Sequence, residues 1–247
     1  MRIGYNAIAA ILGGDLLMLF DVVRRLRSRG GHFDPETAAY RRVQARGYAP
    51  DAVIDVGAYE GHWTRNARAV FGDVPTLMIE PQAAKRAGLE ALCRELPHTR
   101  LAPHVLAAHA GESVTFYEME TGSSLMPERS DVPRREMLLI TETLDAVAPD
   151  TANLFLKIDA QGAELEILAG GEATLRRASL VQLEAAVAKY NDGAPSLREV
   201  LAFMEQRGFA LLDISGTTRI QDHLVQVDLL FVPDHSPLLK SFFHFAH

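Results

Sequence analysis

Short apolar segments alternate with helical segments along most of the chain, and this alternation constrains the fold more than any other feature of the sequence. The apolar segments lie at residues 52–56, 76–79, 101–107, 154–158 and 180–184. The helical segments lie at residues 64–71, 83–95, 164–176 and 196–207. Short apolar strands separated by helices are typical of βαβ units, in which helices cover both faces of a parallel sheet. The sequence therefore predicts an α/β fold with a mainly parallel sheet.

The last part of the predicted sheet departs from this alternation. Residues 209–214 and 226–232 are apolar and have no helix between them, so we expect an antiparallel pair of strands at one edge. A further strand is expected at residues 114–117, and a polar stretch rich in Gly, Ser and Pro follows at 122–133. We interpret this stretch, which includes Ser124, as a long loop over the sheet and a candidate lid.

Composition excludes several classes of protein. A chain of 247 residues, 48% of them hydrophobic, can bury a core of its own, which argues for one main domain and against disorder. With 25 Lys and Arg against 32 Asp and Glu, the net charge of -7 disfavours nucleic acid as a partner. Cys93 is the only cysteine, so an intramolecular disulfide is excluded and a reducing, cytoplasmic location is expected.

The first 50 residues are expected to form a helical extension ahead of the main domain at 51–247. Residues 3–20 are mostly apolar, but Asp15 interrupts them and they are shorter than the roughly 20 residues that span a bilayer. We therefore expect a soluble helix here and no stable membrane insertion, with a membrane-surface anchor as the alternative. The extension is available for an acceptor pocket or a homodimer contact.

The first predicted strand ends in a glycine-containing turn, Asp55-Val56-Gly57-Ala58-Tyr59-Glu60-Gly61. Two glycines at such a turn either make a tight bend only or let the backbone approach a ligand closely. The turn does not match the G-x-G-x-x-G pattern of nicotinamide-binding folds, and Glu60 places negative charge where a pyrophosphate would bind.

Acidic residues also end the next strands. Glu80, followed by Pro81, ends the second strand, where a carboxylate can accept hydrogen bonds from the two hydroxyls of a ribose. Asp159 ends a later strand, directly before a glycine and a helix. S-adenosylmethionine carries a ribose and a sulfonium but no phosphate, so acidic strand ends suit it better than they suit NAD.

Taken in order, these segments resemble the FkbM family of S-adenosylmethionine-dependent methyltransferases. The motifs are Asp55-Val56-Gly57-Ala58 with Gly61, Ile79-Glu80-Pro81, Leu144-Asp145, Leu156-Lys157-Ile158-Asp159, Gln161-Gly162-Ala163-Glu164 and Leu168-Ala169-Gly170. The resemblance implies a class I methyltransferase (Rossmann-like) fold with a seven-stranded sheet. It also implies O-methylation of a small molecule or sugar in natural-product or polysaccharide biosynthesis.

The resemblance also assigns roles around the cofactor. It places Asp55, Gly57 and Gly61, with Ala58 and Tyr59 between them, around the methionine part of S-adenosylmethionine. It places Glu80 and Pro81 at the ribose, Asp159 near the transferring methyl, and Ser124 near the cofactor. The sequence departs from the family at Tyr59, where many members have Asn or Ser, and at Gln161, where many have Glu.

Three residues are candidates for catalysis. Asp159 is the first choice for a general base, and its alternative role is to cap the helix that begins near Gly162. Glu184 ends the next strand and borders the same crevice. His62 follows Gly61 at a helix start and is either a base or a solvated surface residue.

Other functions remain open at this point. The rivals are N-methylation of a peptide or amide, a cofactor-binding scaffold without catalysis, and a nucleotide-dependent oxidoreductase. Lys157 is either a structural ion-pair partner or a catalytic group. No metal is expected, because His223 with Asp222 and Asp228 matches no firm ligand spacing.

Overall fold

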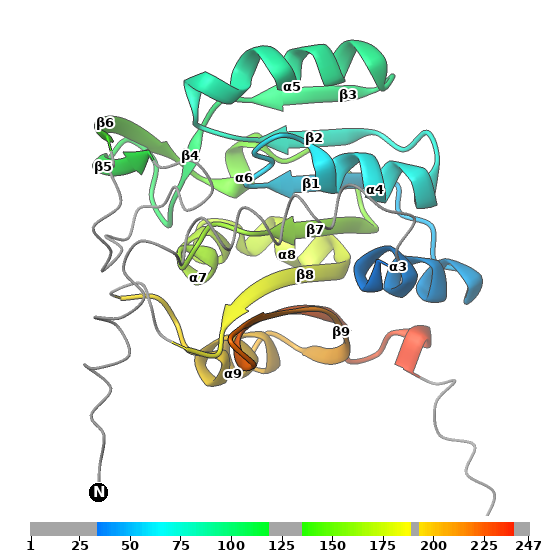
Figure 1. Cartoon of the computed structure of the whole chain (residues 1–247). Coiled ribbons are helices and arrows are strands. Elements are labelled where there is room, and N and C mark those ends of the chain that lie inside the picture. Colours follow the sequence, from blue (N-terminus) through cyan, green and yellow to red (C-terminus); the bar gives the residue numbers. More distant parts are fainter. Residues whose placement is uncertain (1–33, 119–134, 189–192, 240–247) are drawn as a thin grey trace, which may run out of the picture.

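The computed structural model of the chain describes residues 34–118, 135–188 and 193–239 (Figure 1). Its centre is a seven-stranded sheet in the order β3-β2-β1-β7-β8-β10-β9. The strands are β3 Thr99–Ala102, β2 Thr76–Ile79, β1 Ala52–Val56, β7 Leu154–Ile158, β8 Ala178–Ala186, β10 His223–Pro233 and β9 Phe209–Ile220. The first five are parallel, and β10 runs antiparallel to both of its neighbours. The predicted parallel sheet with an antiparallel edge pair is confirmed.

Helices cover both faces of this sheet. One face carries α3 Pro35–Ala45, α4 His62–Phe71 and α5 Ala83–Glu95. The other carries α6 Leu144–Val147, α7 Glu164–Ala169, α8 Glu172–Arg177 and α9 Leu197–Glu205, and a short 3-10 helix, Pro237–Leu239, follows β10. None of the helices in the described part of the chain is long and apolar enough to cross a membrane.

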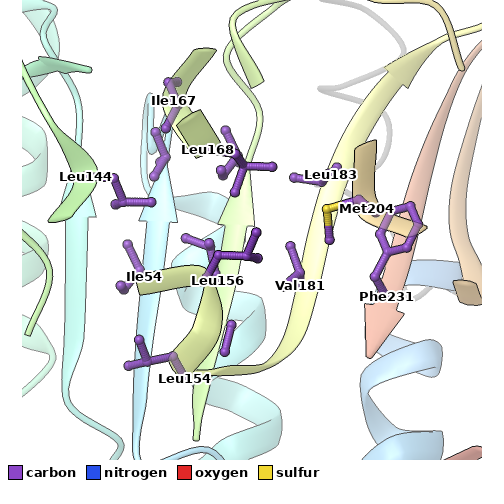
Figure 2. Packing of buried hydrophobic residues seen from close by; sticks show 14 of the residues in the cluster. Ile54, Leu144, Leu154, Leu156, Ile167, Leu168, Val181, Leu183, Met204 and Phe231 are labelled. Atoms are coloured by element: carbon purple, nitrogen blue, oxygen red, sulfur yellow. The ribbon is translucent and has the colours of Figure 1, made fainter. Parts of the chain in front are cut away.

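The larger core lies between the sheet and α6 to α9. Leu154, Leu156 and Ile158 of β7 point into it and are fully buried, together with Ile54 of β1 and Val181 of β8 (Figure 2). The alternate residues of the same strands face α3 and α4. Because the central strands are buried on both faces, their sequences are continuously apolar, which explains why the sequence pattern located them well.

The α3 face is more aromatic and carries the only described part of the N-terminal extension. Asp34 caps α3 by accepting hydrogen bonds from the backbone of Glu36 and Thr37, and Pro35 occupies the first turn. Tyr40 of α3 is completely buried and packs edge-on against Trp63 and Phe155. At least this helix of the extension therefore belongs to the core of the sheet domain. The boundary predicted at residue 50 stays a prediction.

A second, three-stranded sheet was not predicted. It has the order β4-β6-β5, with β4 Val105–Leu106, β6 Arg135–Glu142 and β5 Ser113–Glu118. It lies on the side of the large sheet toward which β1, β2 and β7 point (Figure 1). The predicted strand 101–107 is wrong as a single element, because its residues divide between β3 and β4 around Pro103, whose nitrogen has no hydrogen to donate.

The predicted helix 164–176 is also wrong as one element. Gly170 and Gly171 divide it into α7 and α8. A Cβ on Gly170 would lie 2.2 Å from the carbonyl oxygen of Ala107, so only glycine lets the chain pass the end of β4. Asp145 restarts the helix, because its carboxylate accepts the backbone N–H groups of Ala173 and Thr174 at 3.0 and 2.7 Å. The motifs Leu144-Asp145 and Leu168-Ala169-Gly170 therefore have structural roles.

Candidate active site

The two glycines of the turn after β1 serve different purposes. Gly57 has φ of +74°, and a Cβ on it would lie 1.9 Å from the carbonyl oxygen of Asp159, so the turn presses against the end of β7. Gly61 also has a positive φ, but its missing side chain makes room for Leu92 of α5, because a Cβ on Gly61 would lie 2.2 Å from a methyl carbon of that leucine. Gly57 shapes the rim of the sheet, whereas Gly61 allows helix packing.

Tyr59 lies between these glycines in the left-handed backbone region, at φ of +48°. Asn tolerates this region better than other residues with a side chain, which accounts physically for the Asn that many family members carry there. In this chain the Tyr59 ring is covered by Lys85, whose Nζ lies 3.8 Å from the ring centre and 2.9 Å from Glu60 Oε1. A cation–π contact and an ion pair thus hold the turn from outside.

Glu80 is held at the end of β2 by two backbone hydrogen bonds. Its Oε2 accepts the N–H of Tyr59 at 2.8 Å, and its Oε1 accepts the N–H of Gln82 at 2.9 Å. Burial raises the pKa of Glu80, and these two bonds oppose the rise. The carboxylate of Glu80 therefore holds the glycine-containing turn in place, and it lies at the end of β2.

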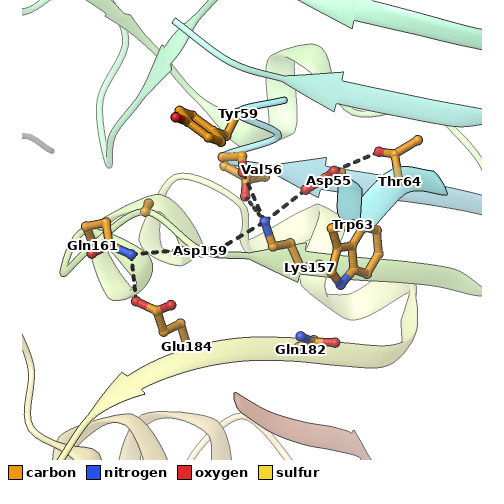
Figure 3. A network of polar contacts seen from close by, with 12 residues as sticks. Asp55, Val56, Tyr59, Trp63, Thr64, Lys157, Asp159, Gln161, Gln182 and Glu184 are labelled. Carbon is orange, nitrogen blue, oxygen red and sulfur yellow. Dashed lines mark hydrogen bonds and ion pairs between the residues drawn. The ribbon is translucent and has the colours of Figure 1, made fainter. Parts of the chain in front are cut away.

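Asp55 and Lys157 form a buried ion pair beneath the turn (Figure 3). Lys157 Nζ lies 3.0 Å from Asp55 Oδ1 and also donates to the carbonyl oxygens of Val56 and Gly57, at 3.2 and 3.0 Å. The other oxygen of Asp55 accepts the hydroxyl of Thr64 at 2.7 Å. Both charged groups thus support the turn from inside, and the structural role considered for Lys157 matches this placement.

At the end of β7, Asp159 is connected to β8 through a glutamine. Gln161 Nε2 donates to Asp159 Oδ1 at 2.9 Å and to Glu184 Oε1 at 2.8 Å (Figure 3). Asp159 Oδ2 lies 3.7 Å from Lys157 Nζ. Neighbouring parallel strands end at the same edge of the sheet, which is why the two carboxylates meet although they are far apart in sequence.

The start of α7 does not use Asp159 as its cap. Its N-cap is Ala163, which makes no side-chain cap hydrogen bond, and Glu164 instead accepts the N–H groups of Ala160 and Gly162 in the preceding loop, at 3.0 Å each. Burial raises the pKa of Glu164 to about 7, and those hydrogen bonds oppose the rise. Asp159 therefore does not cap the helix, and it lines the pocket described next.

A small pocket, partly open to solvent, lies beyond the ends of β1, β2 and β7. Five of the predicted site residues line it: Gly57, Tyr59, Glu80, Pro81 and Asp159. Further lining residues are Val56, Ile79, Gln82, His104, Val105, Leu106, Phe116, Ala160, Gln161, Ala163 and Ile167. Several of these come from β4 and β5 of the unpredicted sheet, so the sequence pattern gave little sign of them.

The other predicted site residues lie elsewhere. Ala58 packs with Met78 and α5, and Asp55 and Gly61 lie behind the turn. His62 is exposed on α4, 3.4 Å from Glu60, and is not among the residues that line the pocket. Glu184 does not line the pocket, but it accepts a hydrogen bond from Gln161, which does. Ser124 lies outside the described residues, as does the whole of the predicted lid at 122–133.

The chemistry of the pocket suits a cofactor with a ribose and a positive charge. Among its described lining residues there are two carboxylates, Glu80 and Asp159, and no Lys or Arg. Apolar side chains from Leu106, Phe116 and Ile167 provide a wall for a flat ring system. A phosphate would meet carboxylates here without a cation. No group of residues suited to holding a metal ion is found in the described parts of the chain.

A solved structure with a similar architecture supports the fold. An S-adenosylmethionine-dependent methyltransferase from Clostridium acetobutylicum superposes with a TM-score of 0.50 at 8% identity, over 93% of this chain and 98% of that one. Magnesium protoporphyrin IX methyltransferase from Synechocystis PCC 6803 gives 0.49 at 11% identity, over 94% of this chain and 100% of that one. At such low identity, similarity indicates only the fold.

Sequence comparison identifies the family. No curated protein matches the chain significantly. The family description "Methyltransferase FkbM domain" matches residues 55–211, more than half of the chain, and this range includes Gly57, Glu80 and Asp159. The chain therefore belongs to the FkbM family of S-adenosylmethionine-dependent methyltransferases.

Proposed function

We propose that the enzyme transfers the methyl group to a hydroxyl of a small molecule or sugar, in natural-product or polysaccharide biosynthesis. Asp159 carries this proposal, because its carboxylate lies in the pocket at the end of central strand β7. A hydroxyl must lose its proton as it accepts a methyl group, and a carboxylate within hydrogen-bond reach can take that proton. The acceptor class follows from the family, whose members usually methylate such hydroxyls.

In this proposal the side chains bind and orient the reactants. Glu80 accepts hydrogen bonds from the ribose hydroxyls, and the turn at Gly57 allows close approach of the methionine part. The bound donor supplies an electrophilic methyl group on a positively charged sulfur. As the acceptor oxygen bonds to that methyl, the carbon–sulfur bond breaks, and Asp159 takes the acceptor's proton. Alignment and exclusion of water account for most of the remaining acceleration.

A screen of acceptors with labelled S-adenosylmethionine, read by mass spectrometry, tests the proposal. Asp159→Asn is expected to keep binding of S-adenosylhomocysteine within a few-fold and to lower turnover by at least a hundredfold. Asp150→Asn is the matched control, because Asp150 is fully exposed beside Arg177 and does not line the pocket. Its turnover should equal that of the wild type.

Each outcome of the screen assigns a function. A product methylated on oxygen supports the proposal, whereas a product methylated on nitrogen supports the rival reaction. Cofactor binding without product from any acceptor would favour a scaffold. Binding of NAD in calorimetry without binding of S-adenosylmethionine would contradict the whole assignment.

A further inference from the structure

Gln161 joins two carboxylates that approach from different strands. We propose that Gln161 is a positioning residue, which keeps Asp159 and Glu184 both ionised and side by side next to the methyl donor. The inference rests on the proposed function, because it takes Asp159 to lie beside the reacting methyl. Nothing in the family assignment gives this glutamine a role.

The number of donors on the amide supports the inference. One nitrogen, Nε2 of Gln161, carries two hydrogens, and it makes two hydrogen bonds, of 2.9 Å to Asp159 and 2.8 Å to Glu184. Each carboxylate oxygen accepts, so both groups can be ionised at once. A glutamate of the same length offers at most one proton, and none when ionised, so it could not satisfy both acceptors.

The backbone at Gln161 shows that the loop is held in an unfavourable conformation. Gln161 has φ of +53°, a left-handed conformation that residues with a Cβ rarely adopt. The conformation brings its side chain onto the pocket wall. The two side-chain hydrogen bonds and the backbone bonds from Ala160 and Gly162 to Glu164 stabilise the loop in this form.

Several charged groups lie around the pair, among them Asp228 of β10, which is directly opposite Glu184 in the sheet. Lys157 on β7 lies 3.7 Å from Asp159 Oδ2, and it is itself paired with Asp55 of β1. On α7, Glu164 interacts electrostatically with Asp159. A third carboxylate at position 161 would therefore enter a site that already holds several negative groups and one cation. Carboxylates in direct contact cannot all be ionised near neutral pH, so one proton would be retained there.

Two cofactor forms report the charge of this site without an acceptor. S-adenosylmethionine carries a positive sulfonium, whereas S-adenosylhomocysteine has a neutral sulfur and otherwise shares its contacts. The ratio of their dissociation constants measures the negative charge beside the sulfur. A change that alters only folding or pocket shape shifts both constants and has no reason to make their ratio titrate.

The experiment measures both dissociation constants by calorimetry between pH 6 and 8, on the full chain. Gln161→Glu keeps the length of the side chain and adds a titrating group, while Gln161→Asn keeps the amide but is too short for both bonds. Asn also tolerates the left-handed backbone, which protects folding. Gln206→Glu, on an exposed residue at the end of α9, is the matched control for added charge.

The wild type and Gln206→Glu are expected to give a ratio independent of pH. For Gln161→Glu, preference for S-adenosylmethionine should rise roughly threefold to tenfold from pH 6 to pH 8, as the shared proton is lost. A flat ratio for Gln161→Glu would overturn the inference. A titrating ratio in the wild type would overturn it too, because the pair would then hold a proton although the amide bridges it.

Failure of the inference is separable from failure of the proposed function. If the wild type binds neither cofactor form, the methyl-transfer proposal itself falls. If both forms bind and the Gln161→Glu ratio is flat, only the positioning role is lost. Once an acceptor is found, Gln161→Asn should lower kcat at least tenfold while leaving KM for S-adenosylmethionine within a few-fold.

Discussion

Replacing Gly57 by Ala tests how closely the turn after β1 must approach β7. The new Cβ would lie 1.9 Å from the carbonyl oxygen of Asp159, whereas a carbon–oxygen contact needs about 3.3 Å. The turn or the strand end must then move by more than about 1 Å. The positive φ adds about 1–2 kcal/mol, and overpacking a tight site costs about 1–3 kcal/mol. The free energy of unfolding should therefore fall by about 2–5 kcal/mol.

Gly111 provides the control for the backbone cost alone. Its φ is +83°, but a Cβ there meets nothing within 4 Å. Gly111→Ala should therefore lose only about 1–2 kcal/mol. Urea unfolding followed by circular dichroism gives both values, and calorimetry gives affinity for S-adenosylhomocysteine. We expect at least a tenfold weaker dissociation constant for Gly57→Ala and no change for Gly111→Ala. Equal effects of the two variants on stability and affinity would refute the close-approach argument.

Two further predictions concern buried glutamates. Glu80→Ala should weaken binding of S-adenosylhomocysteine in calorimetry by about ten- to a hundredfold, because it removes the acceptor for the ribose and for the N–H groups of Tyr59 and Gln82. Glu80→Gln should lose less affinity. An unchanged dissociation constant for Glu80→Ala would disprove the ribose assignment. For Glu164, the folded pKa of about 7 lies above the ordinary glutamate value of 4.5, so the folded state binds the extra proton, and stability from this group falls as pH rises from about 4.5 through 7. Glu164→Gln should remove this loss of stability. In urea titrations, the free energy of unfolding of Glu164→Gln relative to that of the wild type should therefore increase between pH 5 and 8, by an amount on the order of 2–3 kcal/mol. A difference between the two proteins that does not change with pH would contradict the raised pKa of Glu164.

The sequence predicted the large sheet well because each central strand is buried on both faces. Leu154 to Ile158 and Ala52 to Val56 have no polar face to confuse the pattern, apart from Asp55 and Lys157, which neutralise each other. Strand β6 was not predicted, because exposed Leu138 and Ile140 alternate with half-buried neighbours on a small sheet, and this mixture resembles an irregular segment. Strands β9 and β10 are longer than the apolar segments predicted at 209–214 and 226–232. The end of their hairpin is partly exposed to solvent, so its residues are not continuously apolar.

The sequence was enough to predict which residues of the candidate site lie at the strand ends, but not which side chains they contact. Parallel strands end at one edge, so Glu80 and Asp159 could be placed together from their positions alone. Whether a carboxylate faces the pocket depends on which side of the strand it occupies and on what it meets there. Asp55 meets Lys157, which lies 102 positions away in the sequence, and Glu184 meets Gln161. Such pairings follow from strand order, which local pattern does not contain.

The ammonium group of Lys157 has a consequence for motion in the pocket. It donates to a carboxylate and to two carbonyl oxygens on β1 and the turn, and it originates from β7. One cation thus ties the two strands that flank the proposed position of the donor's reactive end, and separating them would leave several buried acceptors without a donor. Exchange of product for fresh donor should therefore depend on displacement of the opposite wall, formed by β4 and β5, while the β1–β7 rim stays fixed through successive turnovers.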